Sequence, residues 1–129
     1  MKKIKKKKKS QKSIIKKLDN KWAKLVKLKA KEKCQKCGKT EHLNSHHIFS
    51  RSNQKVRWFL PNGVCLCPSC HVFSNYSAHK APVEFIEWLK EKNSDEWYKE
   101  LRMEANKTDK VDKMLVDEYL NNELKQVDN

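Results

Sequence analysis

Four cysteines constrain this chain more than any other feature, because they form two C-x-x-C pairs. The pairs are Cys34/Cys37 and Cys67/Cys70, and residues 38–66 lie between them. Four thiolates can complete the tetrahedral shell of a zinc ion, and a complete shell leaves no open position for chemistry. The spacing therefore predicts a structural zinc site. The alternative is four incidental cysteines in a core.

A fifth cysteine, Cys65, lies two residues before Cys67. On a strand these two side chains would point to the same side. We expect Cys65 to be a spare buried thiol, with substitution for another zinc ligand as the less favoured alternative.

The composition favours helices joined by short turns. The chain has 129 residues, of which 36% are charged, with 2 glycines and 3 prolines. This length predicts one domain with extensions. A protein with a small core commonly needs additional stabilisation, such as a bound metal ion.

The net charge of +14 is unevenly distributed along the sequence. Residues 1–33 contain sixteen lysines against Asp19 and Glu32, whereas residues 82–129 are acidic overall. The basic N-terminal and central segments suggest a polyanionic partner, with nucleic acid as the leading candidate.

The expected location is cytoplasmic. No apolar segment follows the basic residues 2–9, as a secretory signal would require, and no run is long enough for a membrane span. In a reducing compartment, paired C-x-x-C motifs predict metal binding and not disulfides.

Residues 1–13 are low in complexity and strongly basic, so we expect a disordered tail. Residues 14–33 have apolar side chains at helical spacing. This basic amphipathic helix could lie on a membrane or in a partner's groove, but its direct run into Cys34 favours packing on the metal site's scaffold. We therefore assign residues 14–93 to one domain with a leading helix.

The central stretch predicts a knuckle, two short strands and a helix. The expected elements are the knuckle at 34–40, strands at 43–50 and 64–66, a loop at 51–61, a tight turn at Asn62-Gly63 and a helix at 71–80. Further helices are expected at 82–93, from Ser94, and from Thr108 or Asp109 to about 124. Residues 94–129 would form a helical extension able to contact a protein partner or a second copy.

Histidines gather around the predicted zinc site. His46 and His47 are adjacent, so on a strand they would point to opposite faces. His71 would begin the helix, with Asn75 and His79 on the same helical face.

The runs HHIFSRS and PNGVCLCPSCH resemble the HNH endonucleases, and in particular small phage-type members with a four-cysteine zinc site. The match covers about residues 14–90 and is strongest over 34–71. The resemblance implies an α+β, mostly helical protein with a ββα-metal core, flanked by a basic N-terminal helix and C-terminal helices.

The resemblance also implies roles for single residues. His47 would be the general base, and His46 and His71 would bind the catalytic divalent metal. Asn62 would hold the loop and orient His47 through its backbone carbonyl. Asn75 stands where some members have a further ligand, and His79 is either an additional ligand or a surface residue.

The expected cofactors are a structural Zn²⁺ and a catalytic Mg²⁺ or Mn²⁺, with Ni²⁺ or Zn²⁺ as further candidates for a site rich in histidine. Arg51, Lys55 and Arg57 are the candidates for binding phosphate. The resemblance implies DNA cleavage that leaves 5′-phosphate and 3′-hydroxyl ends. The alternative is a zinc module that binds nucleic acid without cleaving it.

Overall fold

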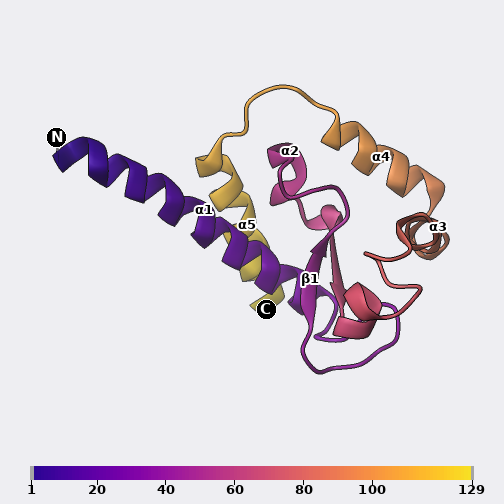
Figure 1. Ribbon diagram of the computed structural model, residues 1–129. Coiled ribbons are helices and arrows are strands. Elements are labelled where there is room, and N and C mark those ends of the chain that lie inside the picture. The colour runs from indigo at the N-terminus through magenta and orange to yellow at the C-terminus, as the bar shows by residue number, and fades with distance from the viewer. Residues whose placement is uncertain (1, 129) are drawn as a thin grey trace.

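The computed structural model describes residues 2–128, with side chains described for residues 11–127. The chain is mostly helical and has one small antiparallel sheet, which confirms the predicted α+β class (Figure 1). The elements are α1 (Lys2–Lys29), β1 (Asn44–His47), α2 (Gln54–Arg57), η1 (Leu60–Asn62), β2 (Gly63–Leu66), η2 (Ser69–Phe73), α3 (Pro82–Lys92), α4 (Asp95–Ala105) and α5 (Lys113–Asp128). Across residues 2–128, no helix has the length and apolar character needed to cross a membrane.

Helix α1 begins at Lys2, so residues 2–13 are helical where we expected a disordered tail; Met1 lies outside the described residues. Lysine is a good helix former, and no glycine or proline interrupts this stretch. The helix ends at Lys29, four residues earlier than expected, because Lys31 and Glu32 take left-handed backbone conformations. The chain then turns into Cys34.

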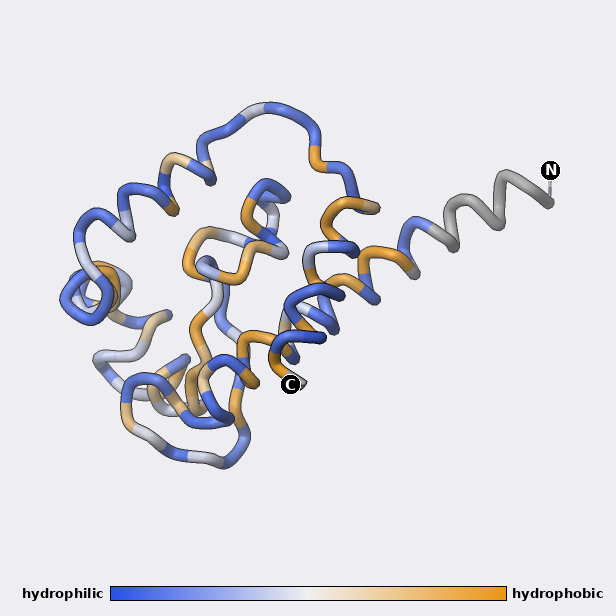
Figure 2. The backbone as a smooth tube through the Cα atoms, turned by 180° about the vertical axis from the view of Figure 1, so that it is seen from behind, coloured by the Kyte–Doolittle hydropathy of each residue, from blue (hydrophilic) through white to orange (hydrophobic). Residues whose placement is uncertain are grey.

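Helix α5 returns to pack along α1, and the two helices share an apolar core (Figures 1 and 2). Leu18, Trp22, Leu25 and Leu120 are buried in it. Ion pairs join Lys21 to Asp117 at 2.6 Å and Lys29 to Glu123 at 3.0 Å. The acidic end of the chain therefore neutralises part of its basic helix.

Helix α5 begins at Lys113, later than expected, because the Asp112 side chain accepts a hydrogen bond from the Met114 amide. The helical spacing predicts an apolar stripe of Val111, Leu115 and Tyr119, with Met114 as a further candidate. Val111 and Tyr119 pack against the core as predicted, but Met114 and Leu115 are exposed. Val116 and Leu120 pack there instead.

Strands β1 and β2 form the two-stranded sheet, in which His46 pairs with Val64 and His47 with Gly63. Gly63 has extended backbone angles, so the expected tight turn at Asn62-Gly63 is absent. Glycine is needed there for space, since a Cβ atom would lie 2.4 Å from a Val26 methyl and 2.8 Å from the Trp22 ring. The strand therefore lies directly against α1.

The helix expected over residues 71–80 does not form. A single π-turn, η2, is followed by bends and turns up to Pro82. Short polar side chains take the backbone's hydrogen bonds: Ser77 donates to the Val72 carbonyl, and Ser74 accepts from the Tyr76 amide.

Helices α3 and α4 pack on the other side of the sheet from α1 and α5 (Figure 1). Pro82 occupies the first turn of α3, and Ser94 caps α4 by accepting from the Trp97 amide, both as expected. Phe85 and Leu89 of α3 are buried with the strand residues Val64 and Leu66 and with Cys34. Leu101 and Ala105 of α4 and Leu120 of α5 are also buried, so both C-terminal helices take part in the packing.

Candidate metal centres and the histidine cavity

The four cysteines of the two C-x-x-C pairs converge in space. The sulfur atoms of Cys34, Cys37, Cys67 and Cys70 all lie within 4.8 Å of one another. The Cys37 and Cys67 sulfurs are 3.5 Å apart. Zinc–sulfur bonds of about 2.3 Å in a tetrahedron place sulfurs about 3.8 Å apart. The group therefore fits a structural metal such as zinc.

Backbone hydrogen bonds support the thiolate form of Cys34. Gly38 has φ +83°, which allows the turn in which its amide donates to the Cys34 carbonyl at 2.8 Å. Burial acts to raise the pKa of Cys34, but backbone hydrogen bonds from Cys67, Cys37 and Lys36 outweigh it and lower the pKa to about 6. Such a thiol is a thiolate at neutral pH, as a metal ligand must be.

Cys65 does not join this group. It is fully buried in the core between α1 and α5, whereas Cys67 lies in the core beneath α3. We expected strand alternation to place Cys65 and Cys67 on the same side of the sheet. This does not occur, because β2 ends at Leu66, before Cys67. Burial raises the pKa of the Cys65 thiol, as expected for a spare core residue.

Three histidines form a second cluster. One ring nitrogen from each of His46, His71 and His79 lies within 4.8 Å of the others. The Nε2 atoms of His71 and His79 are 3.1 Å apart. Two imidazoles on one metal, each bonded at about 2.1 Å, hold their nitrogens about 3.0–3.4 Å apart. The spacing therefore suits a shared divalent cation.

The turn after the last cysteine brings His79 to His71. The Ala78 amide donates to the Cys70 carbonyl at 2.9 Å, and the His79 amide donates to the His71 carbonyl at 3.1 Å. These bonds close residues 71–79 into a loop. Asn75 is exposed within that loop, and the helical spacing that made it a candidate ligand is absent.

A cavity of about 490 Å³ opens at the histidines, and its lining includes His46, His47, His71, His79 and Arg51. Burial, together with the neighbouring His71 and His79, lowers the pKa of His46 to about 3. Burial and His79 also lower the pKa of His71. Both rings are therefore neutral near pH 7 and have a nitrogen lone pair available for a metal.

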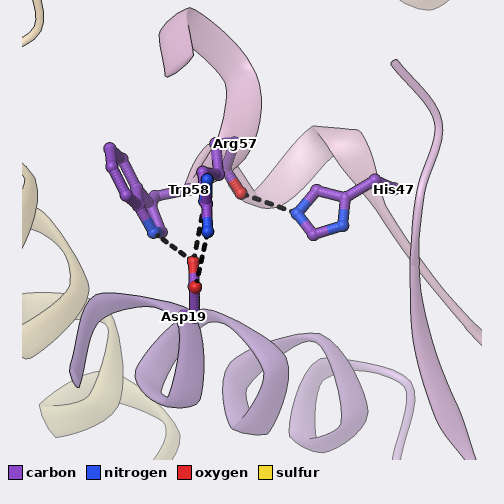
Figure 3. Close-up of polar contacts among 4 residues, drawn as sticks. All are labelled: Asp19, His47, Arg57 and Trp58. Carbon is purple, nitrogen blue, oxygen red and sulfur yellow. Dashed lines mark hydrogen bonds and ion pairs between the residues drawn. The ribbon is translucent and has the colours of Figure 1, made fainter. Parts of the chain in front are cut away.

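His47 lines the same cavity but lies apart from the three clustered histidines, as expected for the next residue of a strand. Its ring stacks on Trp22 of α1, with centroids 3.9 Å apart and planes 12° apart. Its Nε2 lies 2.9 Å from the Arg57 carbonyl oxygen (Figure 3). Burial lowers the pKa of His47, so this ring is also neutral near pH 7.

Asn62 is fully buried and holds the loop between the strands. Its side chain accepts from the Phe49 amide at 2.8 Å and donates to the Phe49 and Val56 carbonyls. Its own carbonyl accepts from the Ile48 amide. Asn62 therefore fixes the loop as expected, but the carbonyl that contacts His47 belongs to Arg57.

Two of the three candidate phosphate ligands are engaged within the protein. Arg57 forms a two-bond ion pair with Asp19, at 2.9 and 2.7 Å, and Lys55 pairs with Asp109 at 3.0 Å. Arg51 lines the histidine cavity and has no ion-pair partner among the side chains of residues 11–127. Arg51 is thus the candidate best placed for a ligand.

Two residues of the site, Asp19 and Trp22, have no predicted role in it. Both belong to α1, where they look like an isolated acid and a core aromatic. His79 was predicted to be either an additional ligand or a surface residue, and the structure places it in the histidine cluster. No local signal reveals the α1 contacts, because they depend on how distant segments pack.

In comparisons with known proteins, no protein-family model, no curated protein and no solved structure matches the chain.

Proposed function

We propose that this protein is a metal-dependent endonuclease that hydrolyses phosphodiester bonds in DNA. The observation that carries the proposal is the histidine cavity. It combines three convergent imidazoles, a fourth imidazole held separately and an arginine, beside a cysteine group that fits zinc. The resemblance of the sequence to HNH endonucleases supports the same proposal, although its expected third ligand, Asn75, lies outside the cluster.

His46, His71 and His79 are the residues that would hold the catalytic metal, with His79 replacing Asn75 as the third ligand. Three imidazoles suit Ni²⁺ or Zn²⁺ best, whereas Mg²⁺ and Mn²⁺ prefer oxygen ligands and would take water and phosphate oxygens in their remaining positions. When bound, a divalent cation supplies charge stabilisation to the phosphate and to the departing 3′ oxygen.

His47 is the proposed general base. It is neutral near pH 7, lines the same cavity and is not part of the three-histidine group. A neutral imidazole can take a proton from water as that water attacks phosphorus. The resulting ends would carry 5′-phosphate and 3′-hydroxyl groups.

Arg51 is the proposed phosphate ligand of the cavity, because a guanidinium can form two hydrogen bonds to phosphate oxygens. The excess of lysine in residues 1–33 supports a polyanionic substrate and would strengthen binding without reading sequence.

The test is cleavage of supercoiled plasmid by the purified, zinc-loaded protein with Mg²⁺ or Mn²⁺. We expect nicked or linear products, loss of cleavage in EDTA, and a decrease of about 10²–10⁴-fold for His47→Ala. His42→Asn is the matched control. His42 is exposed and has a left-handed backbone that asparagine tolerates.

Cleavage that persists undiminished in His47→Ala would contradict the proposed mechanism. Plasmid binding without cleavage, across Mg²⁺, Mn²⁺, Ni²⁺ and Zn²⁺, would contradict the enzyme and support the alternative of a zinc module that binds nucleic acid.

A further inference from the structure

Helix α1 lies outside the strand–loop–strand core, yet it supplies the contacts that hold His47. Asp19 and Trp22 are three residues apart and therefore share one face of the helix. Trp22 stacks on the His47 ring, and its indole nitrogen donates to the Phe59 carbonyl at 3.0 Å. Asp19 acts indirectly: it binds the side chain of Arg57, and the backbone carbonyl of Arg57 contacts His47 (Figure 3).

The contact between His47 and Arg57 fixes the tautomer of the ring. A carbonyl oxygen can only accept a hydrogen bond, so the 2.9 Å contact requires the proton to be on Nε2. In a neutral imidazole the other nitrogen then has the free lone pair. Nδ1 is therefore the nitrogen of His47 that can accept a proton.

The carbonyl that selects this tautomer belongs to the peptide unit between Arg57 and Trp58. Both flanking side chains bind the carboxylate of Asp19. Arg57 donates through Nε at 2.9 Å and through a terminal nitrogen at 2.7 Å, and the Trp58 indole nitrogen donates at 2.8 Å. One carboxylate thus restrains the peptide from both ends.

We propose that Asp19 is a positioning residue for the general base. Its carboxylate orients the Arg57–Trp58 peptide, whose carbonyl holds His47 with the proton on Nε2 and with Nδ1 free. Trp22, on the same face of α1, sets the plane of the ring. This inference depends on the proposed function for the role of His47, whereas the tautomer itself can be measured without any activity.

The test compares Asp19→Asn with Asp117→Asn. Asp117 is a matched control, because it also forms an ion pair with α1, through Lys21, whereas the ion pair and side-chain hydrogen bonds of Arg57 and Trp58 go to Asp19. Both purified variants are examined with zinc bound at about pH 8, where a histidine side chain with an ordinary pKa is neutral. Two-bond ¹H–¹⁵N correlation spectra then report which nitrogen of His47 carries the proton.

We expect the Nε2-protonated form in the wild type and in Asp117→Asn, and a mixture of tautomers in Asp19→Asn. In plasmid cleavage, we expect Asp19→Asn to lower kcat by about tenfold or more with little change in KM, since a misplaced base affects the reaction and not binding. Asp19→Glu, which keeps the charge, should recover part of the loss.

Trp58→Phe is a second variant, which removes one hydrogen bond to Asp19 and should shift the tautomer ratio in the same direction if Asp19→Asn does not fold. An unchanged tautomer in folded Asp19→Asn would overturn the positioning role. A shifted tautomer in a protein that cleaves no DNA would support that role while contradicting the proposed enzyme.

Discussion

His46 and His47 are neighbours in sequence with different surroundings. The strand directs His46 towards His71, His79 and Phe85, and directs His47 towards Trp22 of α1. A single residue step therefore separates the three-histidine cluster from a ring that Trp22 and the Arg57 carbonyl hold. Strand alternation made this separation predictable from the sequence, whereas the identity of the two surroundings required the folded structure.

The low pKa of His46 predicts that stability depends on pH. The folded ring has a pKa of about 3, whereas the unfolded chain has an ordinary histidine pKa of about 6.5. Between these values the unfolded state binds the extra proton, so stability is lost as pH falls below about 6.5. Replacing His46 by glutamine should remove this contribution.

Urea unfolding of zinc-loaded protein without a second metal measures the effect. Below about pH 6, we expect the wild type to lose up to about 1.4 kcal/mol per pH unit more than His46→Gln. His42→Asn is the control and should behave like the wild type. Equal slopes for the wild type and His46→Gln would show that burial does not suppress protonation of His46.

Residues 69–81 form the element in which sequence and structure differ most. The helix expected from His71 would have used Asn75 as its next ligand, whereas the π-turn and closed loop bring His79 into the cluster. The cue was present in Ser74, Asn75 and Ser77, because short polar side chains compete for backbone hydrogen bonds. The position of His79 was not predictable, because it depends on the closure of the loop.

The same element couples the cysteine group to the histidines. Cys70 and His71 share the π-turn, and the Cys70 and His71 carbonyls hold Ala78 and His79. We expect Cys70→Ser to lower the zinc content and to weaken Mn²⁺ binding at the histidines by about tenfold or more. Metal analysis and titration calorimetry measure the two effects separately.

Cys65→Ala is the control for that substitution. Cys65 is the buried cysteine outside the four-thiol group, so the variant should keep both its zinc content and its Mn²⁺ affinity. Full Mn²⁺ affinity in a Cys70→Ser protein that has lost its zinc would show that the two sites are independent.

At the scale of the whole molecule, α5 completes the core that α1 begins. The amphipathic patterns of both helices were visible in the sequence, but their pairing was not, because α1 and α5 lie at opposite ends of the chain. The sequence left the last helix open for a partner or a second copy. In the structure, its apolar face covers α1 instead.

Two leucines of α5 test this packing. Leu120 is fully buried, whereas Leu115 in the same helix is 61% exposed. We expect Leu120→Ala to lower the free energy of unfolding by about 2–5 kcal/mol and Leu115→Ala to change it by about 0.5 kcal/mol or less. Chemical denaturation measures both, and similar losses for the two variants would contradict the packing of α5 on α1.

We infer that the β1–β2 hairpin and the segments on either side of it support two different metal sites, a closed one of four cysteines and an open one of three histidines. Crystals of zinc-loaded protein soaked in Mn²⁺ test it directly through anomalous scattering at the two metal edges. We predict a zinc peak among Cys34, Cys37, Cys67 and Cys70 and a separate manganese peak among His46, His71 and His79. Manganese absent from the histidines, or bound elsewhere without them, would contradict the claim.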